Sequence, residues 1–343
     1  MKVFEGNSLE ELYPQLLVEL IEEGDVVSPR GIKTREISPA TIVINNPKRR
    51  FIPSAVRKLN IGFSIAEPLW IMAGRDDTEM ITHYNRNWLN FSDDGITLNG
   101  AYGRRIFRHP CIDNNGNLIE VNQFKQCYEL LKKDKDSRQA TIVLFNPYLD
   151  GSDKITKDRP CTNIIRYSIR NNKLNALTVM RSQDVVKGTV YDIPLFTMLQ
   201  EVMAGLLGIE VGKYTHVMDS FHIYESDIEW MKDVVNEKYP SLYEETGDFD
   251  GRILGERYED FEFVLNQVMC IEYYTRKNKN ADIFFIIESL NKIENEVWRS
   301  YAAIIATYNL RKYRRTQEEL DMLYPFVTNE YKDIFKERYR QLF

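Results

Sequence analysis

The sequence is poor in cysteine, in net positive charge and in long apolar runs, and each shortage excludes a class of protein. Only four cysteines occur among 343 residues. None forms a Cys-x-x-Cys pair or has a Cys/His metal spacing, so we expect no metal site. The net charge of −6 argues against a protein that grips nucleic acid through its overall charge. No apolar run approaches the roughly 18 residues of a membrane span, and acidic residues stand where a signal peptide has its apolar core. We therefore expect a cytoplasmic protein with no membrane or nucleic-acid partner and with reduced thiols.

Helical patterns occur along the whole chain. Apolar residues make up 43% and charged residues 28% of the sequence, as in ordinary globular proteins. Ser8, with Glu11 three positions later, predicts a capped helix that ends near Gly24. Apolar residues at helical spacing predict buried helices over 61–74 and 191–210.

Strand patterns lie between these helices. Two alternating runs around Asn171-Asn172-Lys173 predict a hairpin over 163–184, and further strands are expected over 137–147 and 213–224. From about residue 224 the sequence is acidic and helical. No long linker divides the chain, so the fold class is α+β, one mixed sheet packed against helices.

One cysteine stands directly after a proline, at the start of an alternating apolar run. A cysteine such as Cys161 at the start of a strand is more often a small buried hydrophobe than a nucleophile. A reactive thiol needs a lowered pKa and therefore nearby cations. The Pro160-Cys161 pair alone favours a structural role.

A second cluster follows the hairpin and can supply such a cation. Arg181 and Ser182 stand at the end of a strand, followed by Asp184, Gly188 and Asp192. An arginine fork beside a hydroxyl suits a phosphate group. Two structural alternatives remain, a surface ion pair for Arg181 and a helix N-cap for Asp192.

A third cluster is the alternating pair His222 and Tyr224 on a predicted strand. The two side chains would share one face of the strand. They could hold sugar hydroxyls, or they could be a satisfied, half-buried pair.

The order and spacing of these three clusters, continuous over about 158–226, resemble the thymidylate synthase family. Glu67 in AEPLWIMAG resembles the catalytic glutamate of that family, and Tyr102-Gly103-Arg104 resembles its tyrosine motif. Ser137-Arg138 resembles the segment that reaches the neighbouring subunit's phosphate site. Arg30 is the best match for the phosphate-loop arginine, with Arg35 as the fallback.

The resemblance implies a fold and an assembly. It implies a catalytic core with a thymidylate synthase-like mixed sheet over 1–230, and we expect 231–343 to form a mainly helical C-terminal extension packed on that core. It also implies a homodimer in which Arg138 completes the partner's phosphate site.

The resemblance also implies a role for each matched residue. Cys161 would add to C6 of a pyrimidine ring, which makes C5 a nucleophile for a one-carbon unit. The donor would be 5,10-methylenetetrahydrofolate, used without a metal. The other implied roles are proton management by Glu67, removal of the C5 proton with help from Tyr102, phosphate binding by Arg30, Arg138, Arg181 and Ser182, sugar binding by His222 and Tyr224, and folate binding by Asp184 and Trp88.

The chain departs from the family pattern at the position that reads the base. Thymidylate synthases carry Asn where this chain has Asp192, and the amide reads N3–H and O4 of uracil. A carboxyl group accepts from the exocyclic amine of cytosine. The same change marks the cytidylate hydroxymethylases, so the sequence predicts a hydroxymethyltransferase acting on dCMP or CMP, with Asp192 in the catalytic set.

Further departures keep two alternatives open. Thr162 stands where a histidine follows the nucleophile, Gln139 replaces the second arginine of the Ser-Arg-Arg segment, and Ser220 replaces an aspartate. The C-terminal segment that closes over folate in the synthases is replaced by helical sequence, which favours entry of water and a hydroxymethyl product. The alternatives are methylation of dUMP by a thymidylate synthase with an unusual tail, and a nucleotide-binding homologue without turnover.

Overall fold

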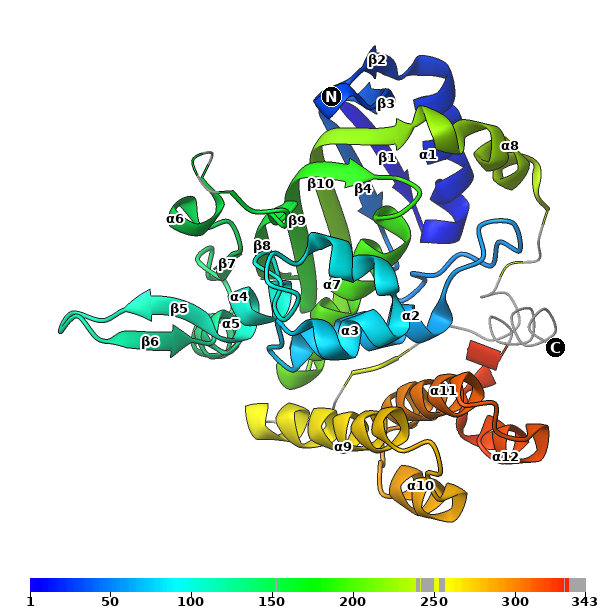
Figure 1. Cartoon of the computed structure of the whole chain (residues 1–343). Coiled ribbons are helices and arrows are strands. Elements are labelled where there is room, and N and C mark those ends of the chain that lie inside the picture. Colours follow the sequence, from blue (N-terminus) through cyan, green and yellow to red (C-terminus); the bar gives the residue numbers. More distant parts are fainter. Residues whose placement is uncertain are drawn as a thin grey trace.

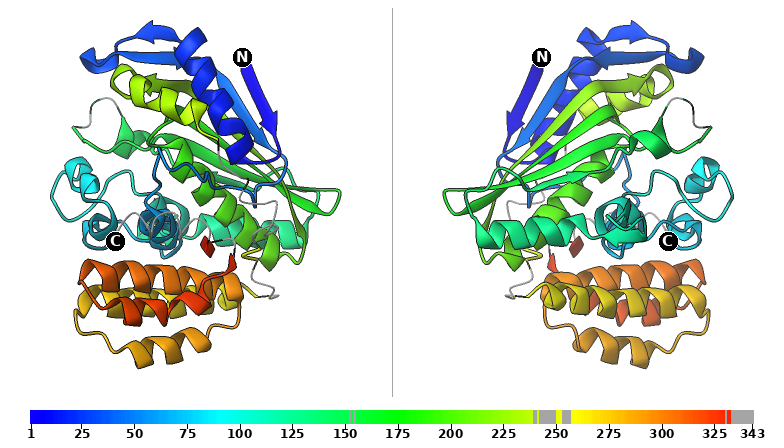
Figure 2. Two further views of the ribbon diagram at one scale, coloured as in Figure 1. Left: turned by 90° about the vertical axis from the view of Figure 1, so that its right-hand side faces the viewer. Right: turned by 90° about the vertical axis from the view of Figure 1, so that its left-hand side faces the viewer.

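The computed structural model describes residues 1–151, 153, 155–238, 241, 250–252, 257–329, 331 and 332. Within them, a large mixed sheet carries helices on its inner side, and further C-terminal helices lie beyond those (Figures 1 and 2). Fold class α+β is therefore confirmed. No helix in the described part of the chain is both long and apolar enough to cross a membrane.

The sheet is built around three long strands. Its main path runs β1-β4-β10-β9-β8-β7, and β3 pairs with β10 and with β2. β9 runs antiparallel to β8 and parallel to β10. The strands are β1 (Lys2–Gly6), β2 (Asp25–Val27), β3 (Thr34–Ile37), β4 (Ala40–Ile44), β7 (Thr141–Val143), β8 (Thr162–Arg170), β9 (Lys173–Asp184) and β10 (Glu210–Tyr224).

The predicted hairpin is formed by β8 and β9. Asn171 and Asn172 have φ of 52° and 57°, the left-handed values that a two-residue turn between twisted strands requires. Lys173, expected in the turn, already belongs to β9. This short turn fixes the register, so that the ends of β8 and β9 that carry Cys161 and Arg181 lie side by side.

The helices of the core begin and end close to the sequence signals. Ser8 caps α1 by accepting a hydrogen bond from the Glu11 amide, 3.2 Å away. Every residue of α2 is buried, as its apolar pattern predicts. The helices are α1 (Leu9–Glu23), α2 (Ile61–Met72), α3 (Thr78–Tyr84), α4 (Tyr102–Phe107), α5 (Gln123–Lys133), α6 (Pro147–Asp150), α7 (Thr189–Leu206) and α8 (Ile228–Asn236).

Short elements complete the core. The strand expected over 137–147 is only the three-residue β7, because Asn146 caps the short helix α6. A separate hairpin of β5 (His109–Ile112) and β6 (Leu118–Val121) projects from the body in Figure 1. The 3-10 turns are η1 (Pro29–Gly31), η2 (Arg86–Phe91), η3 (Glu225–Asp227) and η4 (Tyr324–Phe326).

The C-terminal helices form a layer of their own against α2 and α3 (Figures 1 and 2). They are α9 (Tyr258–Lys277), α10 (Ile283–Asn291), α11 (Glu296–Lys312) and α12 (Gln317–Asp321). The approach of α11 to α2 is close, because a Cβ added at Gly62 would lie 2.3 Å from the ring of Tyr308. Position 62 therefore accommodates only glycine at this helix crossing.

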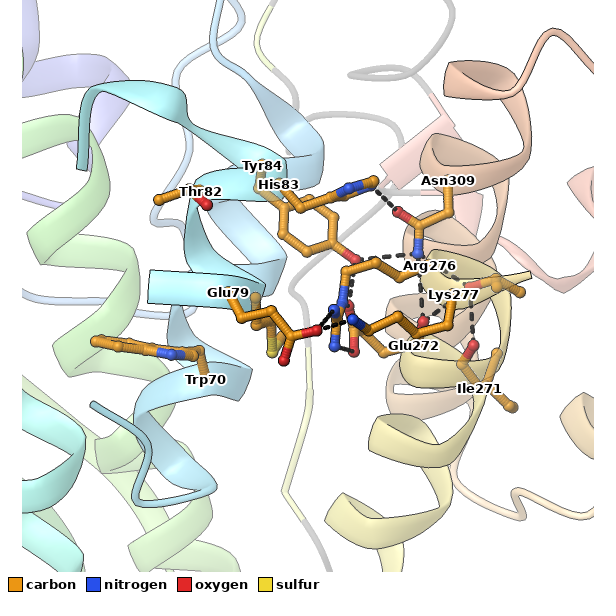
Figure 3. A network of polar contacts seen from close by, with 12 residues as sticks. Trp70, Glu79, Thr82, His83, Tyr84, Ile271, Glu272, Arg276, Lys277 and Asn309 are labelled. Atoms are coloured by element: carbon orange, nitrogen blue, oxygen red, sulfur yellow. Dashed lines mark hydrogen bonds and ion pairs between the residues drawn. The ribbon is translucent and has the colours of Figure 1, made fainter. Parts of the chain in front are cut away.

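A buried polar network joins the C-terminal layer to α3 (Figure 3). Glu272 of α9 accepts hydrogen bonds from the Tyr84 hydroxyl at 2.9 Å and from Nε of Arg276 at 2.6 Å. Asn309 of α11 donates to the Tyr84 oxygen at 3.1 Å and contacts Nε2 of His83 at 3.0 Å. Burial, with Lys312 nearby, lowers the pKa of His83 to about 4. The network therefore holds together elements that are distant in sequence.

Candidate active site

The cysteine segment is fixed by the first pairing of β8 with β9. Cys161 lies one residue before β8 and is partly exposed. Its carbonyl accepts a hydrogen bond from the Arg181 amide at 2.9 Å. The Arg181 guanidinium donates to the carbonyls of Pro160 and Arg159, both at 3.1 Å. The arginine thus lies across the segment that presents the thiol.

The thiol has charged groups of both signs around it. Burial raises the pKa of Cys161, Arg181 and Arg30 lower it, and Asp192 and Asp158 raise it, with a net raised value. In the free protein the thiol form is therefore favoured. Formation of the thiolate needs a base that takes the proton, and an added cation or hydrogen-bond donor would stabilise the anion.

The hydroxyl of Tyr102 lies next to the cysteine segment. Its oxygen accepts from the Thr162 amide at 3.2 Å and from the Thr162 hydroxyl at 3.0 Å. Its ring stacks on Phe196 of α7, with ring centroids 6.1 Å apart. Burial, followed by the charges of Asp192 and Cys161, raises its pKa well above the usual value. Thr162, which replaces a histidine of the family pattern, therefore positions the tyrosine.

Glu67 and Asp192 are two acids on different helices, and the charge of Asp192 acts on Glu67. Glu67 lies on α2 and is 7% exposed. Burial raises its pKa well above the usual value, and the Asp192 charge raises it further. Asp192 acts electrostatically on both Glu67 and the Cys161 thiol, and carboxyl groups with raised pKa values are typical of sites that move protons.

Asp192 does not cap its helix, so that sequence-based alternative is wrong. The N-cap of α7 is Gly188, and Asp192 lies one turn inside the helix, where its amide donates to the Gly188 carbonyl at 2.9 Å. Its Oδ2 accepts from Nε2 of Gln183 at 3.0 Å. Burial raises the pKa of Asp192 to about 6, opposed by the Gln183 hydrogen bond. The hydrogen bond from Gln183 therefore holds the Asp192 carboxyl on the face of α7 that is turned towards the end of β9.

The ends of β9 and β10 bring four further predicted residues together. Asp184 is the register partner of His222, and the Val185 amide donates to the His222 carbonyl at 2.9 Å. His222 and Tyr224 make an edge contact with ring centroids 5.4 Å apart. Ser182 pairs with Ser220, whose hydroxyl donates to Glu36. The predicted sugar-binding pair is thus adjacent to the end of β9.

Asp184 is held by the turn into α7. Its Oδ1 accepts from the amides of Val186 at 2.7 Å and Lys187 at 3.0 Å. Burial raises its pKa, and these two donors oppose that effect. Because two backbone amides hold the carboxyl group, its oxygens lie at fixed positions where they can accept further hydrogen bonds.

Trp88 belongs to an aromatic wall that reaches α7. Its ring lies 6.1 Å from Trp70 and 6.4 Å from Phe63, measured between centroids. Phe63 in turn makes an edge contact with Tyr191 at 4.9 Å. Tyr191 directly precedes Asp192, so the wall continues as far as the predicted base-binding residue.

Two of the predicted arginines lie on exposed loops. Arg30, in η1, is exposed with φ of 54° and acts electrostatically on Cys161. Arg138, before β7, is exposed, and its carbonyl accepts from Arg166 at 2.6 Å. An exposed Arg138 is available to a second subunit, and its role there stays a prediction.

Sequence reasoning missed three residues that shape the site. Gln183 is one, and its place inside the R-S-Q-D motif was the available signal. Asp158 is another, because its Oδ2 accepts from the Gly100 amide at 2.7 Å and so ties the cysteine segment to the Tyr102 loop. Arg57 is the third, because it donates twice to the Val186 carbonyl, at 2.9 and 2.7 Å. Asp158 and Arg57 gave no sequence signal, because their partners are distant in the chain.

Comparison with known families decides the classification of this arrangement. The family model described as thymidylate synthase matches residues 11–269. The chain belongs to the thymidylate synthase family. The match extends past residue 230 and includes most of α9, so the family domain reaches into the C-terminal layer.

Several curated relatives of this thymidylate synthase family member come from phages. A protein named deoxyuridylate hydroxymethyltransferase from Bacillus phage SP01 is 40% identical over 229 residues, which are 66% of this chain and 60% of that protein. Proteins of the same name from Delftia phage PhiW-14 and Pseudomonas phage M6 are 31% and 29% identical, over 63% and 66% of this chain and 58% and 62% of those proteins. The chain thus matches about three fifths of the length of these relatives.

The raised pKa of Asp192 predicts a pH-dependent stability for this family member. Because the folded pKa is about 6 and the unfolded one about 4, stability is fully present below about pH 4 and is lost as pH rises through 6. Asp192→Asn should therefore be more stable than the parent at pH 7, by at most about 3 kcal/mol, and the difference should vanish towards pH 4. Urea unfolding between pH 4 and 8 measures it. Asp136→Asn, at an exposed loop position, is the control, and a pH-independent gain in Asp192→Asn would contradict the prediction.

Proposed function

We propose that this chain transfers a hydroxymethyl unit to C5 of a pyrimidine nucleoside monophosphate through a covalent bond between Cys161 and C6. The observation that carries the proposal is that Arg181, Tyr102 and Asp192, from three separate segments, lie near enough to interact electrostatically with the Cys161 thiol, and that Asp192 also acts on Glu67. The family membership and the names of the phage relatives support it.

The chemistry follows from the placement of these side chains. The Cys161 thiolate adds to C6, and the electron pair of the C5–C6 bond moves to C5, which then attacks the one-carbon unit. The phosphate group of a bound nucleotide would contact both Arg181 and Arg30, which would then form one anion site beside the thiol. Tyr102, held by Thr162, would help remove the C5 proton. Water would then supply the hydroxyl of the hydroxymethyl group as the tetrahydrofolate carrier leaves, and loss of the thiolate from C6 would restore the ring. Glu67, whose pKa is raised by burial, would supply and recover protons at the ring.

The residues present fit a folate donor. 5,10-Methylenetetrahydrofolate supplies the one-carbon electrophile when it is bound. Trp88 and its aromatic neighbours offer a flat apolar wall, and the Asp184 carboxyl offers a fixed acceptor for pterin N–H groups. His222 and Tyr224 would hold the sugar, with Ser182 at the phosphate. The partner's Arg138 would complete the phosphate site in a homodimer.

Uracil is the first candidate base, because the phage relatives bear the name deoxyuridylate hydroxymethyltransferase. A neutral carboxyl group at Asp192 can replace the family's amide, since its O–H donates to O4 and its carbonyl accepts from N3–H. The pKa of Asp192, raised by burial to about 6, keeps this neutral form accessible.

Cytidylate, as dCMP or CMP, is the second candidate, and Asp192 itself favours it. The carboxyl carbonyl would accept from the exocyclic amine, and its O–H would donate to N3. The names of the relatives do not favour this base, so cytidylate stays a prediction.

Release of tritium from C5 tests the function directly. Purified protein with methylenetetrahydrofolate should release tritium from C5-labelled dUMP or dCMP, and mass spectrometry should find the hydroxymethyl nucleotide. Formation of the methyl nucleotide with dihydrofolate would contradict hydroxymethylation and indicate thymidylate synthesis. Nucleotide binding without any tritium release would contradict turnover and indicate a binding protein.

A further inference from the structure

Gln183 is a buried amide that no proposed catalytic step uses. It lies near the end of β9 and is 2% exposed. Its Nε2 donates to Oδ2 of Asp192 at 3.0 Å and to Oγ1 of Thr189 at 3.3 Å. Both hydrogen bonds are donated by Nε2. They offset the free energy that it costs to remove the amide from water, so they hold the side chain in one position.

The orientation of this amide follows from its neighbours. The Thr189 hydroxyl gives its single proton to the Asp184 carbonyl, 3.3 Å away. Its oxygen can therefore only accept from Gln183, so the NH₂ group, and not the carbonyl, faces Thr189. The same nitrogen is the atom nearest to Asp192, which makes Gln183 a donor to the carboxyl.

The backbone is shaped around this pair. A Cβ added at Gly188 would lie 2.9 Å from Nε2 of Gln183 and 3.1 Å from Oδ2 of Asp192. Only glycine permits that approach without displacement of the pair. The Gln183–Asp192 contact therefore depends on the glycine at the N-cap of α7.

We propose that Gln183 is a specificity-determining residue, which selects the base by fixing the proton of the neutral Asp192 carboxyl on Oδ1. A neutral carboxyl has one donor oxygen and one good acceptor oxygen. Because the Gln183 N–H points at Oδ2, that oxygen is the acceptor and Oδ1 carries the proton. This inference rests on the proposed function, in which Asp192 reads the base.

The fixed proton separates the two bases. Uracil presents an acceptor at O4 and a donor at N3, whereas cytosine presents a donor at N4 and an acceptor at N3. A neutral carboxyl could satisfy either base if its proton were free to move between the two oxygens. With the proton held on Oδ1, one base can form both hydrogen bonds with the carboxyl group. For the other base, a donor of the base would face the carboxyl donor and an acceptor of the base would face the carboxyl acceptor. Such a mismatch in a site built for hydrogen bonds is strongly rejected.

The test measures base preference in Gln183→Leu. We expect the ratio of kcat/KM for dUMP and dCMP, from tritium release, to move towards one by at least about tenfold, because either carboxyl oxygen can then carry the proton. The same change in the Asp192→Asn background should leave the ratio unaltered, because an amide has no mobile proton. Gln200→Leu is the matched control, since Gln200 is an equally buried amide that donates to Leu174 and Gly212 instead. It should keep the parent ratio.

Each outcome has a distinct meaning. An unchanged ratio in Gln183→Leu, with turnover retained, overturns the role of Gln183 and leaves the proposed function intact. An equal shift in both backgrounds also overturns it, because Gln183 would then not act through Asp192. No nucleotide binding and no tritium release in the parent protein overturn both proposals. If Gln183→Leu does not fold, Thr189→Val, which removes the acceptor that orients the amide, should shift the ratio in the same direction, and an unchanged ratio there overturns the inference.

Discussion

Replacing Cys161 by alanine should abolish tritium release from C5 of the nucleotide substrate. Without the sulfur no bond forms at C6, and C5 of an aromatic pyrimidine is too weak a nucleophile to attack the one-carbon unit. Removing a covalent nucleophile commonly costs several orders of magnitude in rate, so activity should fall below detection. Scintillation counting of released tritium measures it.

The controls separate chemistry from folding and from binding. Cys270 is an exposed thiol on α9 and Cys111 a half-buried one on β5, so Cys270→Ala and Cys111→Ala should keep full release. Cys161→Ala should still bind the nucleotide in calorimetry, because the side chains proposed to bind it remain. Retained turnover in Cys161→Ala would contradict covalent catalysis.

The nucleophile segment was predictable because its determinants are local. Alternation of apolar residues defines β8 and β9, and the asparagine pair defines the turn between them. Together they set the register that brings Cys161 next to Arg181. A short turn and a period of two suffice to place one strand end against the other.

The environment of Asp192 was not predictable, because it depends on how the chain folds back between the end of β9 and the start of α7. A sequence cannot tell an N-cap aspartate from one that lies a turn further along, since helix starts read from sequence are uncertain by about two to four residues. The position of Asp192 depends on Gly188, because the absence of a side chain there lets the start of α7 lie close to the Gln183 amide. The partner of Gln183 is thus visible only in three dimensions.

The proposed chemistry also depends on the C-terminal layer, although none of its described residues is proposed to touch the substrate. Glu67 lies in the middle of α2, and the first turn of α2 packs against Tyr308 of α11. α3 leads directly into η2, which carries Trp88. The layer therefore supports both the acid and the aromatic wall from behind. The network of Figure 3 is the polar part of that support.

Glu272→Ala should be among the most destabilising single changes in the described chain. Glu272 is fully buried, and its loss leaves the nearly buried Arg276 guanidinium with the exposed Glu79, 3.2 Å away across the interface, as its one ion-pair partner among the described residues (Figure 3). The Tyr84 hydroxyl also loses its acceptor. Removing one member of a buried ion pair costs about 3–5 kcal/mol, and urea unfolding at pH 7 measures it.

Two matched variants decide whether the cost arises from the stranded charge. Glu288→Ala removes an exposed pair with Lys292 of similar spacing, at 2.8 Å, and should cost no more than about 0.5 kcal/mol. The double change Glu272→Leu with Arg276→Met replaces the buried pair by apolar side chains of similar volume and should recover most of the lost stability. A loss of less than about 1 kcal/mol in Glu272→Ala, or no recovery in the double variant, would show that the pair does not hold the layer. Because α3 continues into the segment with Trp88, partial detachment of the layer should also expose α3 amides to hydrogen exchange before global unfolding.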